Sequence, residues 1–555
     1  MPSESGRSRP LPRSIGRFPD LRRKETTMGM SVTFATDAVA SQAPPVPLDK
    51  PALACGEDDA LTWGQLREKE LRYAYALRRA GVTKGDRVGV LLRNSTDYVC
   101  LFLACARVGA IAVRLNWRLT APEVQFALED SETETLVLDA EFGPVITATR
   151  SSVPVKRYIV RDDGFPLPEW ATPLEDFSSL DGERPVLPVV GVDDPVSLLY
   201  TSGTTGRPKG VVYTHGNMLW ISAIQIQKWK FDSSFVGHTA GPLFHVGGFE
   251  AFLLPALHTY GTAVMSPSGG FTVEGFLAAA RKHRSTSILL YPGMVAELLS
   301  HPDPRSLVPD SVKQILTGGD LVAPWLYDRL EKVLPGVRMD QTYGLTEGGA
   351  LNVALDHADA HWHESSIGRA QAMSEVKVVR PDGALTAPDE VGEICVRSGG
   401  VSVGYWRRPD ADKDTFVDGW CHTGDLARVS PDGFVYLAGR AKDMIRSGGE
   451  NVYPAEIEQV LNSHDAVVES AVIGVPDDTY VEVGAAVIVV QEGHEIDVEA
   501  LRDYLLGRLA KFKVPKYFTV VDALPRNANG KVQKANLRQL YGDPHRYHHT
   551  EGASS

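Results

Sequence analysis

The alternation of short apolar runs with helical segments is the feature that most constrains how this chain folds. RVGVLLR, residues 87–93, reads as a buried strand, and NSTD directly after it supplies helix-capping side chains. Tyr98, Leu101 and Cys105 then recur at helical spacing before a second apolar run, AIAVRL, at residues 110–115. Because parallel strands joined by a helix need covering on both faces, this order predicts a layered α/β body.

The same alternation returns further along the chain and then gives way to other patterns. SILLYPG (287–293) and QILTGGD (314–320) each place an apolar strand before a Pro or Gly break. Residues 385–437 hold short β-type runs separated by turns, which indicates a β-rich subdomain. At 555 residues the chain is too long for one core. We expect a disordered extension at 1–30, a large layered α/β N-terminal domain at 31–439, a small α+β C-terminal domain at 440–541 and a disordered tail at 542–555.

Charge and cysteine content argue against several classes of function. The net charge of −13 and the pI of about 5.6 speak against a nucleic-acid partner, because displacing counterions from phosphates needs a basic surface. No uninterrupted apolar run reaches about 18 residues, so no membrane span is predicted. The cysteines form neither a C-x-x-C pair nor an even disulfide framework, which favours reduced thiols in a cytoplasmic protein. They are Cys55, Cys100, Cys105, Cys395 and Cys421.

The stretch YTSGTTGRPKGVVYTH, residues 200–215, places glycines, hydroxyl residues and a lysine between two β-type runs. Its glycines let successive backbone N–H groups converge, and the side chains add further donors, which suits a polyphosphate. Pro208 before the lysine and Gly210 after it depart from the P-loop of kinases and GTPases. A turn-rich surface hairpin is the alternative. The candidate phosphate-binding residues are Thr201, Ser202, Gly203, Thr204, Thr205, Gly206 and Lys209.

This stretch closely resembles the phosphate-loop signature of the AMP-forming adenylating enzymes, which include acyl- and aryl-CoA synthetases and firefly-type luciferases. Further signatures of that family follow in the same order. They are PLFHVGG at 242–248, TGGD at 317–320, QTYGLTEGG at 341–349, GEICVR at 392–397, HTGD at 422–425, GRAKDMIRSGGENVYPAEIE at 439–458 and PRNANGKVQK at 525–534. The resemblance spans nearly the whole chain from about residue 61 to 540.

The resemblance implies a two-step reaction. A carboxylate attacks the α-phosphorus of ATP and forms an acyl-adenylate, and a thiol, usually that of CoA, then displaces AMP. The implied function is an ATP-dependent, AMP-forming ligase that joins a fatty, cyclic or aryl carboxylate to CoA, with Mg²⁺ as cofactor. One alternative passes the acyl group to a carrier protein, an amine or another nitrogen nucleophile. A binding protein that kept the fold without catalysis is the second alternative.

The resemblance also implies roles for individual residues. Glu347 would hold Mg²⁺ as a hard oxygen ligand, with Thr346 beside it. Lys531 would neutralise charge that develops at the carboxylate and α-phosphate, and Lys209 would contact the phosphates. His245 would gate the carboxylate site, although a satisfied core histidine is the alternative. The remaining nucleotide and CoA contacts would be Gly318, Gly319, Asp320, Gln341, Thr342, Tyr343, Gly344, Asp425, Arg440, Lys442, Gly448 and Gly449.

The same resemblance assigns Lys442 to a hinge about which the small C-terminal domain rotates, so that domain is expected to be mobile. Gly448 and Gly449 would let the pantetheine arm of CoA pass. The residues from Gly247 onward would wall an apolar acyl pocket. Candidates for the CoA phosphates are Arg446, Lys511, Lys513 and Lys516, with a solvated basic face as the equal alternative. The histidines of HADAHWH, at 357, 361 and 363, are interpreted as a polar loop rather than a zinc site.

Overall fold

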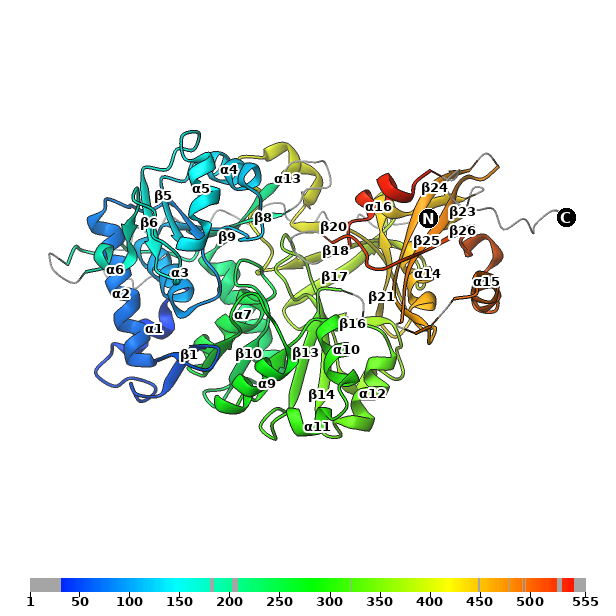
Figure 1. Ribbon diagram of the computed structural model, residues 1–555, viewed down its shortest axis with the longest axis horizontal. Coiled ribbons are helices and arrows are strands. Elements are labelled where there is room, and N and C mark those ends of the chain that lie inside the picture. Colours follow the sequence, from blue (N-terminus) through cyan, green and yellow to red (C-terminus); the bar gives the residue numbers. More distant parts are fainter. Residues whose placement is uncertain are drawn as a thin grey trace, which may run out of the picture.

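The protein is described from a computed structural model. The structure describes residues 31–179, 184–201, 208–320, 322–447, 450–477, 479–491, 493–494, 496–526 and 532–543. The chain forms two sheets in a large N-terminal body and a third sheet in a smaller C-terminal unit (Figure 1). This arrangement confirms the expected large α/β domain followed by a small α+β domain.

The first sheet contains the strand–helix–strand unit predicted at 87–115. Its order is β7-β6-β5-β3-β4-β8-β9, with parallel pairing except between β8 and β9. Helix α3 (Thr96–Val108) joins β3 to β4, and Ser95 caps it by accepting from Tyr98 N, as the NSTD run predicts. The strands are β3 (Arg87–Leu91), β4 (Ile111–Arg114), β5 (Thr135–Asp139), β6 (Arg157–Arg161), β7 (Thr172–Pro173), β8 (Pro195–Thr201) and β9 (Lys209–Thr214).

The second sheet runs from a parallel half into an antiparallel half. The parallel half has the order β14-β13-β12-β10-β11-β1, with β2 antiparallel at its edge. Its strands are β1 (Pro51–Cys55), β2 (Asp59–Thr62), β10 (Val236–Thr239), β11 (Thr262–Met265), β12 (Ser287–Leu289), β13 (Gln314–Gly318) and β14 (Arg338–Tyr343). The antiparallel half comprises β15 (Val353–Leu355), β16 (Ser366–Ala370), β17 (Ser374–Val379), β18 (Gly392–Ser398), β19 (Phe416–Val417), β20 (Trp420–Val429) and β21 (Val435–Arg440). The β-rich region predicted at 385–437 corresponds to β18–β21, and the half also includes β15–β17, which precede that region.

One apolar core joins the first two sheets. It contains residues of α3, α7 and α8 together with strands from both sheets, and every residue of α3 except Asp97 and Arg107 is buried. The two sheets therefore pack through helices that lie between them, and this packing brings the ends of β8 and β9 towards the loop that follows β14. The helices of this body are α1 (Phe34–Val39), α2 (Trp63–Arg79), α4 (Ala121–Asp130), α5 (Gly143–Thr149), α6 (Leu174–Phe177), α7 (His215–Trp229), α8 (Leu254–His258), α9 (Val273–Lys282), α10 (Pro292–Ser300), α11 (Pro304–Leu307), α12 (Trp325–Val333) and α13 (Pro409–Thr415).

The C-terminal unit is a small three-layer structure. Helices α14 (Pro454–Leu461) and α15 (Val498–Leu506) pack on one apolar cluster of its sheet, and α16 (Lys534–Tyr541) packs on another. The strands are β22 (Ile445–Ser447), β23 (Glu450–Val452), β24 (Val467–Asp477), β25 (Val481–Val490) and β26 (Tyr517–Val521). In Figure 1 this unit lies beside the antiparallel half of the second sheet. Contacts between α14 and β21 join the two units.

The sequence predicts reduced cysteines and no membrane-spanning segment. All five cysteines are free, as the sequence predicts, and all five are buried. Among the described residues, no helix is both long and apolar enough to cross a membrane.

Buried histidines hold the N-terminal helix α1 against the body and make this contact sensitive to acid. Val32 N donates to His215 Nδ1 (3.3 Å), and His258 Nε2 lies 3.1 Å from Val32 O. Burial lowers the pKa of both histidines from 6.5 to about 4; near His215, Asp194 opposes this shift and Lys84 adds to it. A lowered pKa means that the docked state binds fewer protons than the exposed state, so stability present above pH 6.5 is lost as the pH falls towards 4.

We therefore expect residues 31–39 to exchange their amide hydrogens at least about tenfold faster at pH 4.5 than at pH 7, after correction for the intrinsic rate. Hydrogen exchange read by mass spectrometry checks this. Residues of β4 serve as the internal control, since no histidine of this pair contacts them. Unchanged protection of residues 31–39 across this pH range would contradict the histidine contact.

Candidate active site

The polar end of the β8–β9 hairpin meets the loop that follows β14. Thr201 and Lys209 are directly opposed in the β8–β9 register, so both ends of the connecting loop lie side by side. Thr201 Oγ1 donates to Glu347 Oε1 (3.1 Å). The structure thus brings together Thr201, Lys209 and Glu347, while the predicted loop residues Ser202, Gly203, Thr204, Thr205 and Gly206 lie outside the described residues.

Tyr405 connects these groups, and sequence reasoning missed it. Its hydroxyl donates to Glu347 Oε1 (3.0 Å), and Lys209 Nζ lies 4.4 Å from the centre of its ring. Burial raises the pKa of Tyr405, and the Glu347 carboxylate adds to this shift, so the hydroxyl stays protonated and donates. The aromatic face therefore orients the lysine while the hydroxyl orients the carboxylate. The local sequence, GYWRRP, contains no motif that singles this tyrosine out.

The loop that carries Glu347 is fixed by close backbone contacts. The buried Tyr213 of β9 donates its hydroxyl to Thr346 O. A Cβ on Gly344 would lie 1.4 Å from Ala350 O, so no side chain fits at this position. Gly349 has φ +84°, and a Cβ there would lie 2.2 Å from Gly400 O. These glycines allow the tight path that presents Thr346 and Glu347 beside β8 and β9.

The ends of β13 and β14 form the second part of the site. Gly318 pairs with Thr342, and a Cβ on Gly318 would lie 2.3 Å from Thr342 O. Gly319 follows with φ +83°, and Asp320 is exposed after it. Gln341, Thr342 and Tyr343 occupy the neighbouring strand end, and Gly344 comes directly after it. The carboxyl ends of parallel strands are where open α/β sheets bind ligands, and the absence of a Cβ lets a flat ring approach this backbone.

Asp425 lies between two donors at the edge of this region. Tyr343 donates its hydroxyl to Asp425 Oδ2 (2.7 Å), and Arg440 Nε lies 2.6 Å from Asp425 Oδ1. Asp425 is buried, whereas the Arg440 side chain is 38% exposed, so the arginine can also face a ligand. Burial and then Asp425 raise the pKa of Tyr343, which keeps the tyrosine a donor. The carboxylate retains free lone pairs for the hydroxyl groups of a ligand.

A third part of the site surrounds Tyr291. A Cβ on Gly241 would lie 2.9 Å from the Tyr291 hydroxyl oxygen, and one on Gly319 would lie 3.5 Å from its ring. Tyr291 therefore lies between the 241–248 loop and the end of β13. His245 lies in that loop, where its Nδ1 accepts from Gly247 N (3.3 Å). The predicted helical stretch after it begins as one π-helical turn, η2 (Phe249–Leu253), and continues as α8. Burial raises the pKa of Tyr291 to about 12.

The chain crosses from the large body to the C-terminal unit at Arg440. The next turn, η4 (Ala441–Asp443), carries Lys442, and Asp443 pairs with Arg538 of α16 (2.8 Å). Lys531, three residues before α16, lies outside the described residues, and so do Gly448 and Gly449.

The basic residues proposed for the CoA phosphates do not form one patch of free cations. Lys513 pairs with Glu456 (2.6 Å), and Lys516 pairs with Asp477 (2.7 Å). Arg446 is exposed on β22, and Lys511 begins the short turn η5 (Lys511–Lys513). A CoA phosphate that bound Lys513 or Lys516 would compete with a carboxylate for it.

Two of the HADAHWH histidines face the same carboxylate, and the third has a different partner. His361 Nε2 lies 2.8 Å from Glu331 Oε1, while His363 Nδ1 lies 3.1 Å from the Tyr436 hydroxyl. His357 Nε2 lies 3.7 Å from the same Glu331 oxygen, so two of the three histidines face α12 and His363 faces β21.

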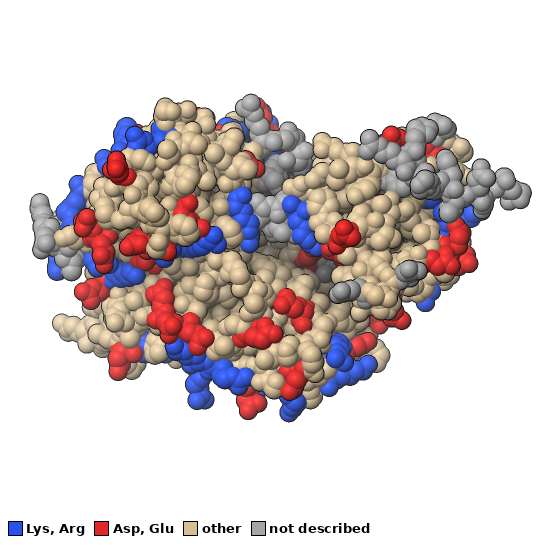
Figure 2. Space-filling model, viewed as in Figure 1, with Lys and Arg blue, Asp and Glu red and all other residues tan. Residues whose placement is uncertain are grey.

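The visible surface agrees with a small-molecule site. On the face in Figure 2, acidic and basic side chains are interspersed, and a hollow lies near the centre. A protein that binds the phosphates of nucleic acid would instead need a continuous basic patch on its surface.

Comparisons with known proteins match this architecture and these motifs. The family model described as AMP-binding enzyme matches residues 39–406, and the model described as AMP-binding enzyme C-terminal domain matches residues 456–531. A feruloyl-CoA synthase from Amycolatopsis sp is 37% identical over 484 residues, which cover 87% of this chain and 94% of that protein. A fatty acid–[acyl-carrier-protein] ligase from Streptomyces coeruleorubidus is 35% identical over 505 residues, covering 89% of this chain and 94% of that protein.

Among solved structures, the o-succinylbenzoate CoA synthetase from Bacillus subtilis in complex with its acyl-adenylate intermediate superimposes with a TM-score of 0.80. It is 32% identical, and the match covers 91% of this chain and 97% of that structure. A structure of the same enzyme in complex with ATP and a magnesium ion gives the same TM-score of 0.80.

Proposed function

The chain belongs to the AMP-binding enzyme family, and from this premise we infer that it is an ATP-dependent, AMP-forming acid–CoA ligase. Its substrates are a carboxylic acid, ATP and CoA, and Mg²⁺ is its cofactor. The observation that carries this inference is that two groups of side chains flank the ends of β13 and β14. Thr201, Lys209 and Glu347 form the first group, and Asp425 and Arg440 form the second.

We propose that the first group of residues holds the phosphates of ATP. Lys209 supplies the positive charge, and the hydroxyl-rich loop before it supplies donors. The half-buried Glu347 carboxylate suits a hard cation, because the side chains of the described residues that hydrogen-bond to it, Thr201 and Tyr405, are neutral hydroxyl donors. Mg²⁺ bound there would neutralise phosphate charge as the α-phosphorus is attacked.

We propose that the second group holds the nucleoside. Gly318, Gly319 and Asp320 border the adenine, and Asp425 with Arg440 contacts the ribose hydroxyls. The acid would lie near His245 and Tyr291, with its carboxylate towards the α-phosphate and its acyl part along η2. Lys531 would stabilise the charge on the reacting oxygens. Lys442 would act as the hinge between residues 31–439 and 440–541, so that the C-terminal domain presents first Lys531 and then Gly448 and Gly449.

The Asp425 assignment predicts a defined kinetic change. Asp425→Asn keeps the shape but removes the charge that pairs with Arg440 and accepts from Tyr343. We expect KM for ATP to rise by roughly 10-fold, the scale of one lost charged hydrogen bond, while KM for the acid changes little. Steady-state kinetics with each substrate varied in turn checks this. An equal rise in both KM values would instead indicate a general disturbance of the fold.

A second candidate function has specific support. The Streptomyces coeruleorubidus relative is named a fatty acid–[acyl-carrier-protein] ligase, so transfer to a carrier-protein phosphopantetheine is the alternative to transfer to CoA. We propose CoA as the acceptor because relatives named CoA ligases include the feruloyl-CoA synthase at 37% identity. The free, buried thiols support the proposed reducing, cytoplasmic environment.

A mass-spectrometric screen tests the proposed function. Fatty, cyclic and aryl acids are each incubated with the protein, ATP, Mg²⁺ and either CoA or a phosphopantetheinylated carrier protein. We expect at least one acid to yield an acyl-CoA. Products only with the carrier protein would replace the CoA proposal by the second candidate, and no thioester from any acid would contradict both.

A further inference from the structure

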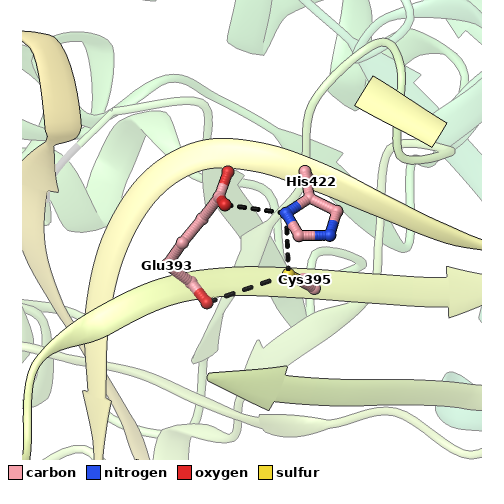
Figure 3. Close-up of side chains that lie close together, drawn as sticks. All are labelled: Glu393, Cys395 and His422. Atoms are coloured by element: carbon pink, nitrogen blue, oxygen red, sulfur yellow. Dashed lines mark hydrogen bonds and ion pairs between the residues drawn. The ribbon is translucent and has the colours of Figure 1, made fainter. Parts of the chain in front are cut away.

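Three side chains with different metal-binding atoms converge between β18 and β20, outside the residues assigned to the reaction. Cys395 and His422 are directly opposed in the strand register, and Glu393 lies two residues before Cys395. Cys395 Sγ lies 3.5 Å from His422 Nδ1, which in turn lies 2.7 Å from Glu393 Oε2 (Figure 3). One donor atom from each side chain lies within 4.8 Å of the other two.

We propose that Glu393, Cys395 and His422 bind a divalent transition-metal ion of the zinc class, at a site separate from the Mg²⁺ position at Glu347. A thiolate, an imidazole and a carboxylate are the donors that zinc uses, whereas Mg²⁺ selects oxygen ligands. Two anionic donors and one neutral donor would balance the charge of a divalent ion.

The spacing of the donors fits a tetrahedral ion with little rearrangement. Zinc bonds of about 2.0–2.3 Å imply donor-to-donor edges of roughly 3.4–3.6 Å in a tetrahedron. The distance of 3.5 Å from Cys395 Sγ to His422 Nδ1 already matches such an edge. The distance of 2.7 Å from His422 to Glu393 is a hydrogen bond and must widen by about 0.7 Å, which a carboxylate side chain can do by rotation.

The surroundings leave a path for the ion and an open coordination position. The Glu393 and His422 side chains are 29% and 23% exposed, while Cys395 is buried beneath them. Lys377 is opposite Cys395 in the neighbouring strand, but its Nζ lies 4.3 Å from the centre of the Trp420 ring. A water molecule can therefore complete a site with three protein ligands.

A redox-sensing role for the Cys395 thiol fits the structure less well than metal binding does. Burial, with a further contribution from Glu393, raises the pKa of Cys395 to about 12, so little thiolate is present for a redox sensor. Metal coordination does not need a preformed thiolate: the Sγ–H bond breaks, an Sγ–metal bond forms and the proton passes to solvent.

The site would also connect to the HTGD segment. Glu393 Oε1 accepts from Gly424 N (2.9 Å), and Gly424 precedes Asp425. An ion held by Glu393 and His422 would link β18 to β20 at this turn. Binding to the folded state alone raises thermal stability, so Zn²⁺ should increase the Tm by a few degrees.

Cobalt substitution tests the site in the full-length protein. After treatment with a chelator, Co²⁺ is titrated into the wild type and into Cys395→Ala, with Cys395→Ser as a near-isosteric second variant. The wild type should bind about one equivalent with a thiolate-to-cobalt absorption band in the near ultraviolet, and Zn²⁺ should abolish the band. Both variants should lose the band, and their Zn²⁺ affinity should fall at least about 10-fold. Cys421→Ala, which removes the adjacent buried thiol, should retain the band.

Two results would overturn the proposal. The first is the absence of a thiolate band in the wild type at saturating Co²⁺. The second is a band that persists at equal intensity in Cys395→Ala and Cys395→Ser, which would place the bound metal elsewhere. The histidine-rich end of the chain, HRYHH, cannot imitate a positive result, because imidazole ligands give no thiolate band.

Discussion

Lys531→Ala should reduce the adenylation half-reaction by about 10²–10³-fold while the transfer of a supplied acyl-adenylate to CoA continues near the wild-type rate. Lysine is a compact, preorganised positive charge, and its proposed place is beside the oxygens where negative charge develops. Helix α16 begins three residues after Lys531 in the sequence, and two ion pairs hold it against the rest of the C-terminal unit. Lys534 of α16 pairs with Glu458 (2.6 Å), and Arg538 pairs with Asp443 (2.8 Å).

The two half-reactions serve as each other's control. Adenylation is measured as acid-dependent release of pyrophosphate in single-turnover mixtures without CoA, and thioester formation is measured from synthetic acyl-adenylate and CoA. Lys531→Arg keeps the charge with a different shape and should retain part of the adenylation rate. An equal loss in both half-reactions for Lys531→Ala would show that the lysine supports the fold or the domain movement rather than the adenylation chemistry.

Glu347→Gln should lower kcat/KM for adenylation by at least about 10²-fold and shift the Mg²⁺ dependence to higher concentration. The amide oxygen can still accept from Thr201 and Tyr405, so the loop should keep its conformation. What the variant loses is the negative charge that a hard cation needs.

Tyr405→Phe is the matched control for Glu347→Gln. It removes the hydroxyl that donates to Glu347 and keeps the ring that packs against Lys209. A hydrogen bond to a carboxylate is worth about 1.5–3 kcal/mol, and the charge that a hard cation needs is kept, so the rate should fall by roughly 10-fold and the Mg²⁺ dependence should stay near that of the wild type. A Glu347→Gln protein with wild-type activity and Mg²⁺ dependence would exclude Glu347 as the metal ligand.

Local sequence patterns predicted much of the fold because apolar runs bounded by Gly, Pro and capping residues determine element type directly. The unit β3–α3–β4 illustrates this, with Ser95 as the helix cap. The pairing of β16 with β21 is different, because it joins segments far apart in sequence. No local signal encodes such a contact, and only the packing of the whole domain selects it.

In the candidate site, too, some residues could be predicted from local sequence and others could not. The glycines at 318, 344 and 349 carry a sequence signal because only glycine fits their backbone contacts. Tyr405 and Tyr213 carry none, since a tyrosine becomes a site residue only through the partners that folding brings to its hydroxyl. Asp425 and Tyr343 were both candidates, but their mutual hydrogen bond depends on the pairing of distant strands.

Acid-dependent exchange of labelled pyrophosphate into ATP is the most direct test of the proposed chemistry. With Mg²⁺, ATP and an acid that forms a thioester, label should enter ATP without CoA, because the acyl-adenylate forms reversibly before the thiol reacts. Omitting the acid or using Glu347→Gln should suppress the exchange. Thioester formation accompanied by ADP and phosphate, with no exchange of pyrophosphate, would contradict an AMP-forming mechanism.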